Sequence, residues 1–310
     1  MGQNKPYNDK PKPYARVALS VDLEDFYHAN YPGYDYREMI SSPSHLIEPT
    51  EIMLDLLEKR GYRVTFFVLG EVAKLFPLLI KKISHAGHEI ASHGESHRLI
   101  TELGPEKTIQ DLRRSVGFLE DITGCKVNGY RAPNYSAHPK RTPWLFAELI
   151  RLGLIYDSSR CPAKTYYSGE PNMSKLPFLM ELPGTGSLWE IPVSCSGPKF
   201  FRFIWAGGFY WRILPLNFII KKIRHLIANG KPAILYLHPK DIDPENPSLP
   251  IGRISNWIHQ VGTKKGEKKL DSMLSRVECG RIIDIIPKEE YGKKQREKEK
   301  NRIATETAMV

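Results

Sequence analysis

The feature that most constrains the fold is a regular alternation between short apolar runs and longer amphipathic segments. The apolar runs predict strands at residues 16–22, 64–69, 88–92, 127–130, 188–193, 233–238 and 281–286. The amphipathic segments predict helices at 50–60, 71–86, 105–123, 142–152 and 215–229, each followed directly by glycine. Strands that alternate with helices in this way predict βαβ units and a mostly parallel sheet.

About seven such units favour a (β/α) barrel over an open sheet, in an α/β protein. We expect this barrel to occupy residues 16–286 as one domain. The chain has 310 residues, of which 41% are hydrophobic, so it can bury a core of this size. The ends, residues 1–15 and 287–310, are rich in charged residues and are predicted to be flexible tails.

Composition excludes several other classes of protein. The net charge is +10, but about six of these charges lie in residues 1–16 and 288–302, and no helix-turn-helix, RNP or zinc-finger pattern accompanies them. Nucleic acid is therefore not expected as a partner. The first residues lack an apolar signal segment, no run of 18 apolar residues occurs, and the four cysteines form no CxxC pair. These features predict a cytoplasmic protein with reduced thiols.

Polar clusters follow the predicted strands at their carboxyl ends. They are Asp22–Asp25, His93–His97, Arg131–Pro133, Asp157–Ser159 and His238–Pro239. In a parallel barrel these ends meet on one face, where reactive side chains gather. Each cluster alone also fits an ordinary turn or helix cap, and a HxxxH pair often arises by chance. Their joint occurrence at successive strand ends favours a site.

The chemistry of these residue types suggests hydrolysis assisted by a metal ion. Two histidines spaced i and i+4 can reach one ion, and one carboxylate would complete a set of three ligands with open positions for water and substrate. A second carboxylate would act as general base. His238 would act as general acid toward a leaving amine, and Arg131 would orient the base and keep it ionised.

In this order, the motifs SVDLED, SHGESH, GYRAP, YDSS and LYLHP resemble those of the polysaccharide deacetylase (NodB-homology) family, carbohydrate esterase family 4. Gly207–Arg212 and His238–Pro244 are further similar to the subfamily found in exopolysaccharide gene clusters. The resemblance covers residues 16–286. It implies a distorted (β/α) barrel of about seven strands. It also implies one divalent metal ion, most commonly zinc, and removal of N-acetyl or other acyl groups from a poly-, oligo- or lipid-linked saccharide.

The resemblance also implies roles for individual residues. His93 and His97 match the metal histidines, Asp22 the general base, Arg131 the arginine that holds this base, and His238 the general acid. The candidate substrate-binding residues are Asn134, whose backbone N–H would stabilise the oxyanion, together with Tyr135, Asp157 and Tyr210.

The first motif departs from the adjacent aspartates that are common in the family, because it contains Asp22-Leu23-Glu24-Asp25. If the strand continues, Asp22 and Glu24 share one face and Asp25 lies on the other. If the chain has turned, Asp25 is the ligand instead. Another alignment would make Glu24 the base and Asp25 the ligand. The sequence leaves the choice between Glu24 and Asp25 open.

Other functions remain as alternatives. One is a metal-independent cyclic amidase of the allantoinase-like branch, and another is a non-catalytic saccharide-binding protein. The aromatic stretch Phe200–Trp211 fits core packing and a lid over the groove, which we favour. It also suits peripheral contact with an anionic membrane surface that carries a lipid-linked glycan.

Overall fold

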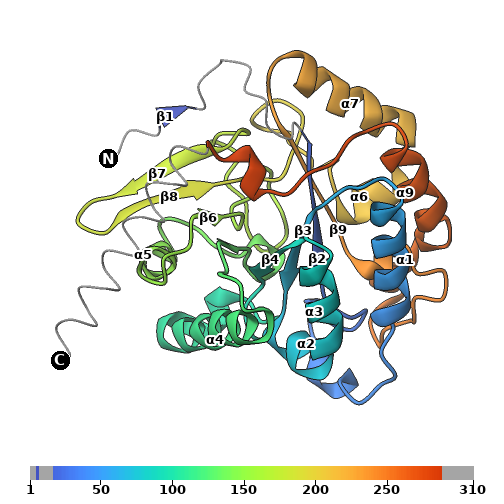
Figure 1. Cartoon of the computed structure of the whole chain (residues 1–310), viewed down its shortest axis with the longest axis horizontal. Coiled ribbons are helices and arrows are strands. Elements are labelled where there is room, and N and C mark those ends of the chain that lie inside the picture. The colour runs from blue at the N-terminus through green and yellow to red at the C-terminus, as the bar shows by residue number, and fades with distance from the viewer. Residues whose placement is uncertain (1–4, 7–16, 288–310) are drawn as a thin grey trace.

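The computed structural model describes residues 5–6 and 17–287. Its centre is a nine-stranded sheet in the order β1-β7-β8-β6-β5-β4-β3-β2-β9. The strands are β1 (Lys5–Pro6), β2 (Val17–Leu23), β3 (Thr65–Val68), β4 (Glu89–Ser92), β5 (Gly129–Tyr130), β6 (Tyr156–Asp157), β7 (Phe178–Leu182), β8 (Gly186–Glu190) and β9 (Ala233–Leu237). Figure 1 shows the helices packed around the outside of this curved sheet.

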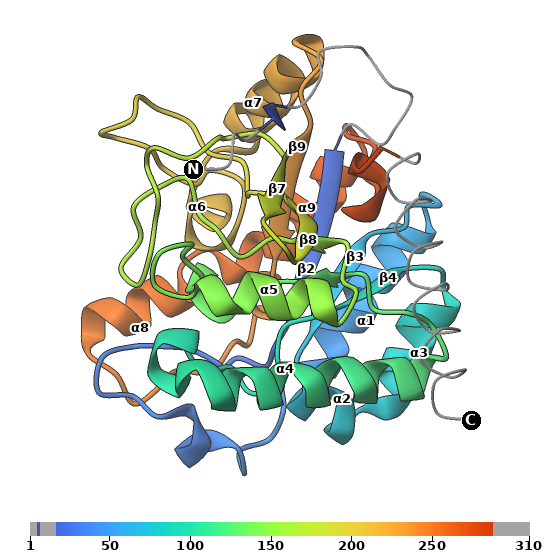
Figure 2. The same cartoon turned by 90° about the vertical axis from the view of Figure 1, so that its left-hand side faces the viewer.

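The helices are α1 (Ile47–Glu58), α2 (Gly70–Leu75), α3 (Pro77–His85), α4 (Ile100–Thr123), α5 (Pro143–Arg151), α6 (Gly208–Ile213), α7 (Leu216–Ala228), α8 (Arg253–Gln260) and α9 (Gly266–Leu274). The predicted helix at residues 71–86 is two helices, because the proline at Pro77 begins a new one. The helices α8 and α9 were not expected from the sequence. In Figure 2, α4 and α5 lie across the front of the sheet.

The sheet curves into an incomplete barrel whose gap is bridged by irregular chain. All pairs from β9 through β2, β3, β4, β5, β6 and β8 are parallel, while β7 joins β8 and β1 joins β7 antiparallel. Across the gap, Ser194 N–H donates to the Ile234 carbonyl at 3.0 Å, and Tyr236 N–H donates to the Ala206 carbonyl at 3.0 Å. The predicted distorted (β/α) barrel is therefore confirmed, with the β1 and β7 pairings in addition.

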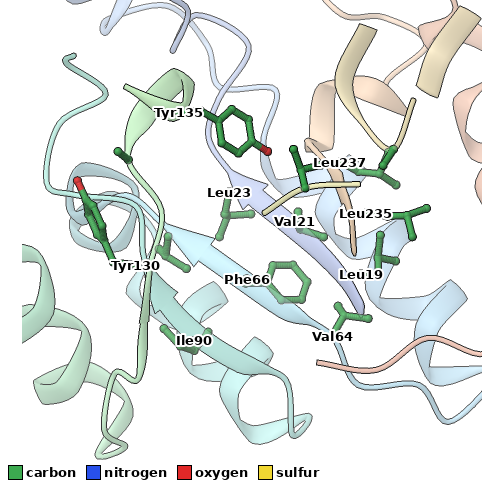
Figure 3. Packing of buried hydrophobic residues seen from close by; sticks show 14 of the residues in the cluster. Leu19, Val21, Leu23, Val64, Phe66, Ile90, Tyr130, Tyr135, Leu235 and Leu237 are labelled. Atoms are coloured by element: carbon green, nitrogen blue, oxygen red, sulfur yellow. The ribbon is translucent and has the colours of Figure 1, made fainter. Parts of the chain in front are cut away.

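Strand β2 shows how the alternating pattern divides the core from the site. Val17, Leu19, Val21 and Leu23 join the main hydrophobic cluster beneath the helices, where Figure 3 shows three of them beside Leu235 and Leu237 of β9. Ala18 belongs to a second cluster inside the barrel. Ser20 and Asp22 alternate with these outward-facing residues along the strand, so their side chains face the interior of the barrel.

The predicted last strand at residues 281–286 is wrong. This segment is a turn with a 3-10 helix at Ile283–Ile285. The residue before it, Gly280, forms an isolated bridge to Ala18 of β2. Ile282, Ile285 and Ile286 pack with the interior cluster, so the segment closes the floor of the barrel. Ile282 N–H donates to Thr65 Oγ1 at 2.8 Å, which fixes this plug to β3.

Two further predictions concern the tails of the chain and membrane-spanning segments. The predicted tails, residues 1–15 and 287–310, fall almost entirely outside the described residues. Within the described part, no helix combines the length and apolar character needed to cross a bilayer.

Candidate metal and catalytic site

One cavity of about 550 Å³ lies at the carboxyl ends of the strands. Most of the residues predicted for catalysis or metal binding line it, and they come from segments far apart in the sequence. They are Asp22, Glu24, His93, His97, Arg131 and His238. The parallel register places the ends of β2, β3 and β4 side by side, which brings these segments together.

Glu24, His93 and His97 form a compact group of buried ligand atoms, all within 4.8 Å of one another. Glu24 Oε2 lies 2.6 Å from His97 Nε2 and 4.0 Å from His93 Nε2. A carboxylate oxygen and an imidazole nitrogen at 2.6 Å would repel each other through their lone pairs, so a proton or a cation must lie between them. Two imidazoles and one carboxylate are the ligand types of catalytic zinc sites.

Hydrogen bonds and burial give the histidines an orientation and a protonation state that suit metal binding. His93 Nδ1–H donates to the Arg131 carbonyl at 2.6 Å, which leaves the lone pair of Nε2 directed toward the cluster. Burial lowers the pKa of His93 to about 4, so this imidazole is neutral at neutral pH, as a metal ligand must be. Asn30 Nδ2 lies 3.3 Å from His97 Nδ1 on the outer side of the second ligand. The residues present therefore fit a divalent ion.

Asp25, the other candidate ligand, lies apart from this cluster. Its carboxylate accepts hydrogen bonds from the backbone N–H groups of Phe26, at 2.8 Å, and His45, at 3.1 Å, and from the Ser44 hydroxyl. It thus holds the loop that follows β2. The sequence did not decide whether Glu24 or Asp25 is the candidate ligand, and in the structure Glu24 is the one that lies beside the histidines.

Asp22 and Arg131 form a buried ion pair beside the cluster. Arg131 Nη1 lies 2.6 Å from Asp22 Oδ1 and 2.9 Å from Ser20 Oγ, and Nη2 donates to Ser158 Oγ at 2.9 Å. The guanidinium also stacks over Phe67, 4.1 Å from the ring centre. These contacts fix Asp22 as a carboxylate that can accept a proton from water.

His238 lies on the other side of Glu24, with Nε2 3.3 Å from Glu24 Oε1. Its Nδ1 lies 3.0 Å from Asp241 Oδ2, which also accepts the His238 backbone N–H at 2.8 Å. Burial alone would lower the pKa of His238, but the Asp241 and Glu24 carboxylates raise it above its usual value. A raised pKa favours the protonated form of this imidazole, which can donate a proton.

The Asp241 carboxylate is itself held by Arg212 of α6. Arg212 Nε lies 3.0 Å from Asp241 Oδ1, and its two terminal nitrogens donate to the backbone carbonyls of Ile258, His259 and Val261. Burial opposes the ionisation of Asp241, but the His238 and Arg212 charges bring its pKa down to about 2. Sequence reasoning assigned no role to either residue, although both lie in motifs that it had quoted.

Several neighbouring side chains also act on Glu24. Burial would raise the pKa of this carboxyl, yet the pKa is held well below its usual range. The side chains that lower this pKa, in order of influence, are His97, Lys240 and His238. Lys240 Nζ lies 3.5 Å from Glu24 Oε1 and also lines the cavity. Glu24 is therefore ionised, as a metal-binding carboxylate must be.

The four predicted substrate-binding residues lie in different places. Asn134 and Tyr135 line the cavity and have φ angles of 52° and 54°, which are uncommon for residues other than glycine and often mark functional sites. Asp157 is fully buried and hydrogen-bonded to Ser159, away from the cavity lining. Tyr210 is 40% exposed on α6, and its neighbour Phe209 lines the cavity instead.

Sequence reasoning missed most of the cavity wall. The wall contains residues from the loop after β2, the loop before β7, and α8, including Asn30, Tyr31, Tyr166, Tyr167 and His259. Asn30 Nδ2 donates to Asn134 Oδ1 at 2.5 Å and to the His97 carbonyl at 3.1 Å, and so links the wall to two other segments of the site. No sequence signal marks these residues: most lie in loops that have no regular pattern, and His259 lies on α8, a helix that the sequence did not predict.

Comparison with known families divides the chain in two. Residues 47–149 match the polysaccharide deacetylase family, and residues 158–287 match a domain of unknown function, DUF3473. A peptidoglycan deacetylase-like protein of Gibberella zeae is 34% identical over half of this chain. A peptidoglycan deacetylase of Helicobacter pylori is 25% identical over 74% of it. The chain spans about half (48%) of the fungal relative and 89% of the bacterial one.

Solved structures agree on the fold. A Mycobacterium smegmatis protein described as a candidate polysaccharide deacetylase has a TM-score of 0.58 at 23% identity, covering 90% of this chain and 92% of its own. The PuuE allantoinase has a TM-score of 0.60 at 16% identity, covering 91% and 92%. Similarity at this level identifies the fold, which both share. By the family match and the two relatives, part of this chain is similar to polysaccharide and peptidoglycan deacetylases.

Proposed function

We propose that this chain, whose residues 47–149 match the polysaccharide deacetylase family, is a metal-dependent hydrolase that removes an N-acetyl or other N-acyl group from an amino-sugar-containing saccharide. One observation carries the proposal. Three buried metal-type ligands share one cavity with Asp22, which is paired with Arg131, and with His238, which is paired with Asp241. The relatives named peptidoglycan deacetylases give independent support.

Glu24, His93 and His97 would hold the ion, and their ligand types favour zinc. A divalent ion there supplies Lewis acidity toward the acyl oxygen and makes water more acidic. The other residues act on the proton and on the substrate. Asp22, held by Arg131, takes the proton of the attacking water, and the Asn134 backbone N–H is proposed to stabilise the oxyanion.

His238 then protonates the departing amine from Nε2, since its Nδ1 is engaged by Asp241. The C–N bond breaks, the acyl group leaves as a carboxylic acid, and the sugar keeps a free amine. The saccharide is proposed to be polymeric, oligomeric or lipid-linked. Tyr135, Asp157 and Tyr210 stay proposals as substrate-binding residues, and a cytoplasmic location and an exopolysaccharide role stay predictions.

The two alternatives lack a specific supporting observation. A cyclic amidase of the allantoinase-like branch shares the fold, but here both histidines and Glu24 are grouped for a metal. A non-catalytic saccharide-binding protein would not need a general acid held by Asp241 and Arg212. Neither alternative is favoured over the deacetylase.

The test measures acyl release by mass on a panel of N-acetylated saccharides, including peptidoglycan fragments, with the metal content determined on the same preparation. We expect a chelator to abolish release, and zinc or cobalt to restore it. His93→Ala is expected to abolish both activity and bound metal, while His85→Ala, at an exposed histidine of α3, should change neither. Full activity in chelated, folded protein would refute the metal-dependent mechanism.

A further inference from the structure

We propose that the surface formed by a hairpin at residues 196–203 and the adjacent side of α7 docks the protein on an anionic lipid bilayer. We call this the docking surface. It combines two exposed phenylalanines at the hairpin tip, Phe200 and Phe201, with a basic cavity behind them. The proposal deepens the proposed function, because a bilayer is where a lipid-linked saccharide would be found, but binding itself does not depend on catalysis.

The hairpin holds its tip away from the body of the protein. Phe200 is 100% exposed and Phe201 is 78% exposed. Ser196 and Phe203 exchange two backbone hydrogen bonds of 3.0 Å, which close the hairpin. At its base, Arg202 Nη1 donates to the carbonyls of Pro162, at 3.2 Å, and Met173, at 2.9 Å. Two adjacent aromatic rings on an anchored tip are unfavourable in water and suited to insertion between lipids.

The hairpin lies against α7, which Figure 2 shows near the loops between β8 and α6. The Phe203 and Phe218 rings stack with their centres 6.5 Å apart, and Lys222 Nζ lies 5.4 Å from the centre of the Phe218 ring. Phe218, Lys222 and His225 follow helical spacing along one side of α7, and this stripe ends at the C-cap residue, Asn229. The last three line the cavity behind the hairpin.

This second cavity has a volume of about 410 Å³ and is basic. Lys175, Lys222, Lys231 and His225 line it together with Ser174, Ser196 and Asn229, and its lining in the described chain includes no acidic side chain. Several cations with hydrogen-bond donors and no counter-charge attract anions. A phosphate-bearing lipid headgroup supplies such an anion directly beside the acyl region that would receive Phe200 and Phe201.

The charge of the surrounding segment points to the same partner. Residues 191–240 contain eight Lys/Arg and no Asp/Glu, whereas the whole chain has 45 and 35. Some of these cations are used internally, as Arg212 is, but Lys199, Lys221 and Arg224 are exposed around the hairpin and α7. Exposed aromatic residues framed by unopposed cations are characteristic of proteins that bind anionic membrane surfaces.

The docking surface is also connected to the rim of the active-site cavity. Phe203 of the hairpin contacts Tyr210 of α6, with ring centres 5.9 Å apart. The same short helix supplies Phe209 and Arg212 to the lining of that cavity. A bilayer contacted by the hairpin would therefore lie close to the cavity rim, where a lipid-linked saccharide could enter.

The experiment is vesicle co-sedimentation with the full chain. We expect binding to vesicles of phosphatidylcholine mixed with phosphatidylglycerol, weaker binding as salt rises, and none to phosphatidylcholine alone. The variant Phe200→Ser with Phe201→Ser, and the variant Lys222→Glu with Lys231→Glu, should each weaken binding at least about tenfold. Leu78→Ser, which is 78% exposed on α3, and Lys107→Glu, exposed on α4, are the matched controls and should bind normally.

Thermal melting and acyl release from a water-soluble oligosaccharide accompany each variant. Unchanged values show that weakened binding is not caused by misfolding, and they test the proposed function separately from docking. Equal binding by all variants would overturn the proposal. So would binding of inorganic phosphate in the basic cavity without vesicle binding, which would indicate a site for soluble anions. A dimer that depends on Phe200 and Phe201, without vesicle binding, would indicate a second copy of the chain as the partner.

Discussion

The proposed metal ligands Glu24 and His93 follow two parallel strands, β2 and β4, that lie on either side of β3, whereas the proposed general acid, His238, is oriented by contacts with side chains of other segments. Glu24 follows β2 and His93 follows β4. The backbone hydrogen bonds that pair both strands with β3 therefore largely fix the positions of these two residues. His238 follows β9, but its orientation depends on Asp241, and Asp241 depends in turn on Arg212 of α6. One cavity is thus built by two kinds of support.

The family matches divide part of the site in a similar way. The polysaccharide deacetylase match, residues 47–149, contains both proposed metal histidines and Arg131, while the DUF3473 match, residues 158–287, contains the proposed acid and its supports. The proposed docking surface also lies in the second match. Glu24 and Asp22 precede both matches, so neither match alone contains the whole candidate site.

The largest expected effect separates the two acids that follow β2. Glu24→Ala removes a ligand from a cluster in which the three ligand atoms lie within 4.8 Å, so we expect metal affinity to fall at least about 100-fold, with loss of acyl release. Asp25→Asn should keep the metal, because Asp25 bonds only to the loop that follows β2. The measurement is metal content after dialysis, together with turnover.

The two variants control for each other, since each removes one of two adjacent buried carboxylates. Circular dichroism spectra that match the parent protein are required of each. If Asp25→Asn lost the metal while Glu24→Ala retained it, the assignment of Glu24 as the ligand would be wrong.

The next effect concerns the second kind of support. Asp241→Asn removes the charge beside His238 Nδ1, and we expect turnover to fall about 10- to 100-fold while the metal content stays unchanged. Arg212→Lys should have a similar but smaller effect, because lysine cannot reach Asp241 and three carbonyls together. Retained metal with reduced turnover would show that these residues support the proposed acid, His238, and do not affect the metal ligands.

Asp243→Asn is the matched control, since Asp243 lies in the same short motif but pairs with His45 instead of His238. It should leave turnover close to that of the parent protein. Equal losses in Asp241→Asn and Asp243→Asn would mean that the motif acts through folding and does not specifically hold the acid.

The smallest effect on activity is expected at the barrel floor, far from the ligands. Burial raises the pKa of Glu89 to about 7, although Thr65, Ile283 and Tyr156 donate hydrogen bonds to its carboxyl. A folded-state pKa above the unfolded value means that stability is fully present below about pH 4.5 and is lost as pH rises through 7. The loss amounts to about 3 kcal/mol at most.

Glu89→Gln cannot ionise, so its stability should fall less than that of the parent protein between pH 5 and pH 8, while turnover remains near normal. Urea unfolding at several pH values measures this difference. Glu106→Gln, at an exposed residue of α4, should retain the parental slope. A parental slope in Glu89→Gln as well would assign the pH dependence to other groups, of which Asp157, with its pKa raised to about 6, is one.

Much of this arrangement follows from local sequence patterns. The alternation of apolar and polar residues in β2 placed Asp22 and Glu24 on one face if the strand continued, and in the structure both line the cavity, where Asp22 meets Arg131. The βαβ pattern predicted that the strand ends converge, because parallel strands place their carboxyl ends on one side. These features depend on periodicities of two or four residues, which a single sequence displays directly.

What remained was decided by contacts between residues far apart in the chain. The meeting of Glu24 with His97, the support of Asp241 by Arg212, and the contact of Asn30 with Asn134 all join segments that are separate in the sequence, and no local pattern encodes such contacts. Residues 281–286 were expected to form a strand, yet they close the floor, because their isoleucines fill an interior that only the curved sheet creates. The sequence by itself thus determined which residues face inward, and the tertiary structure decided which of them meet.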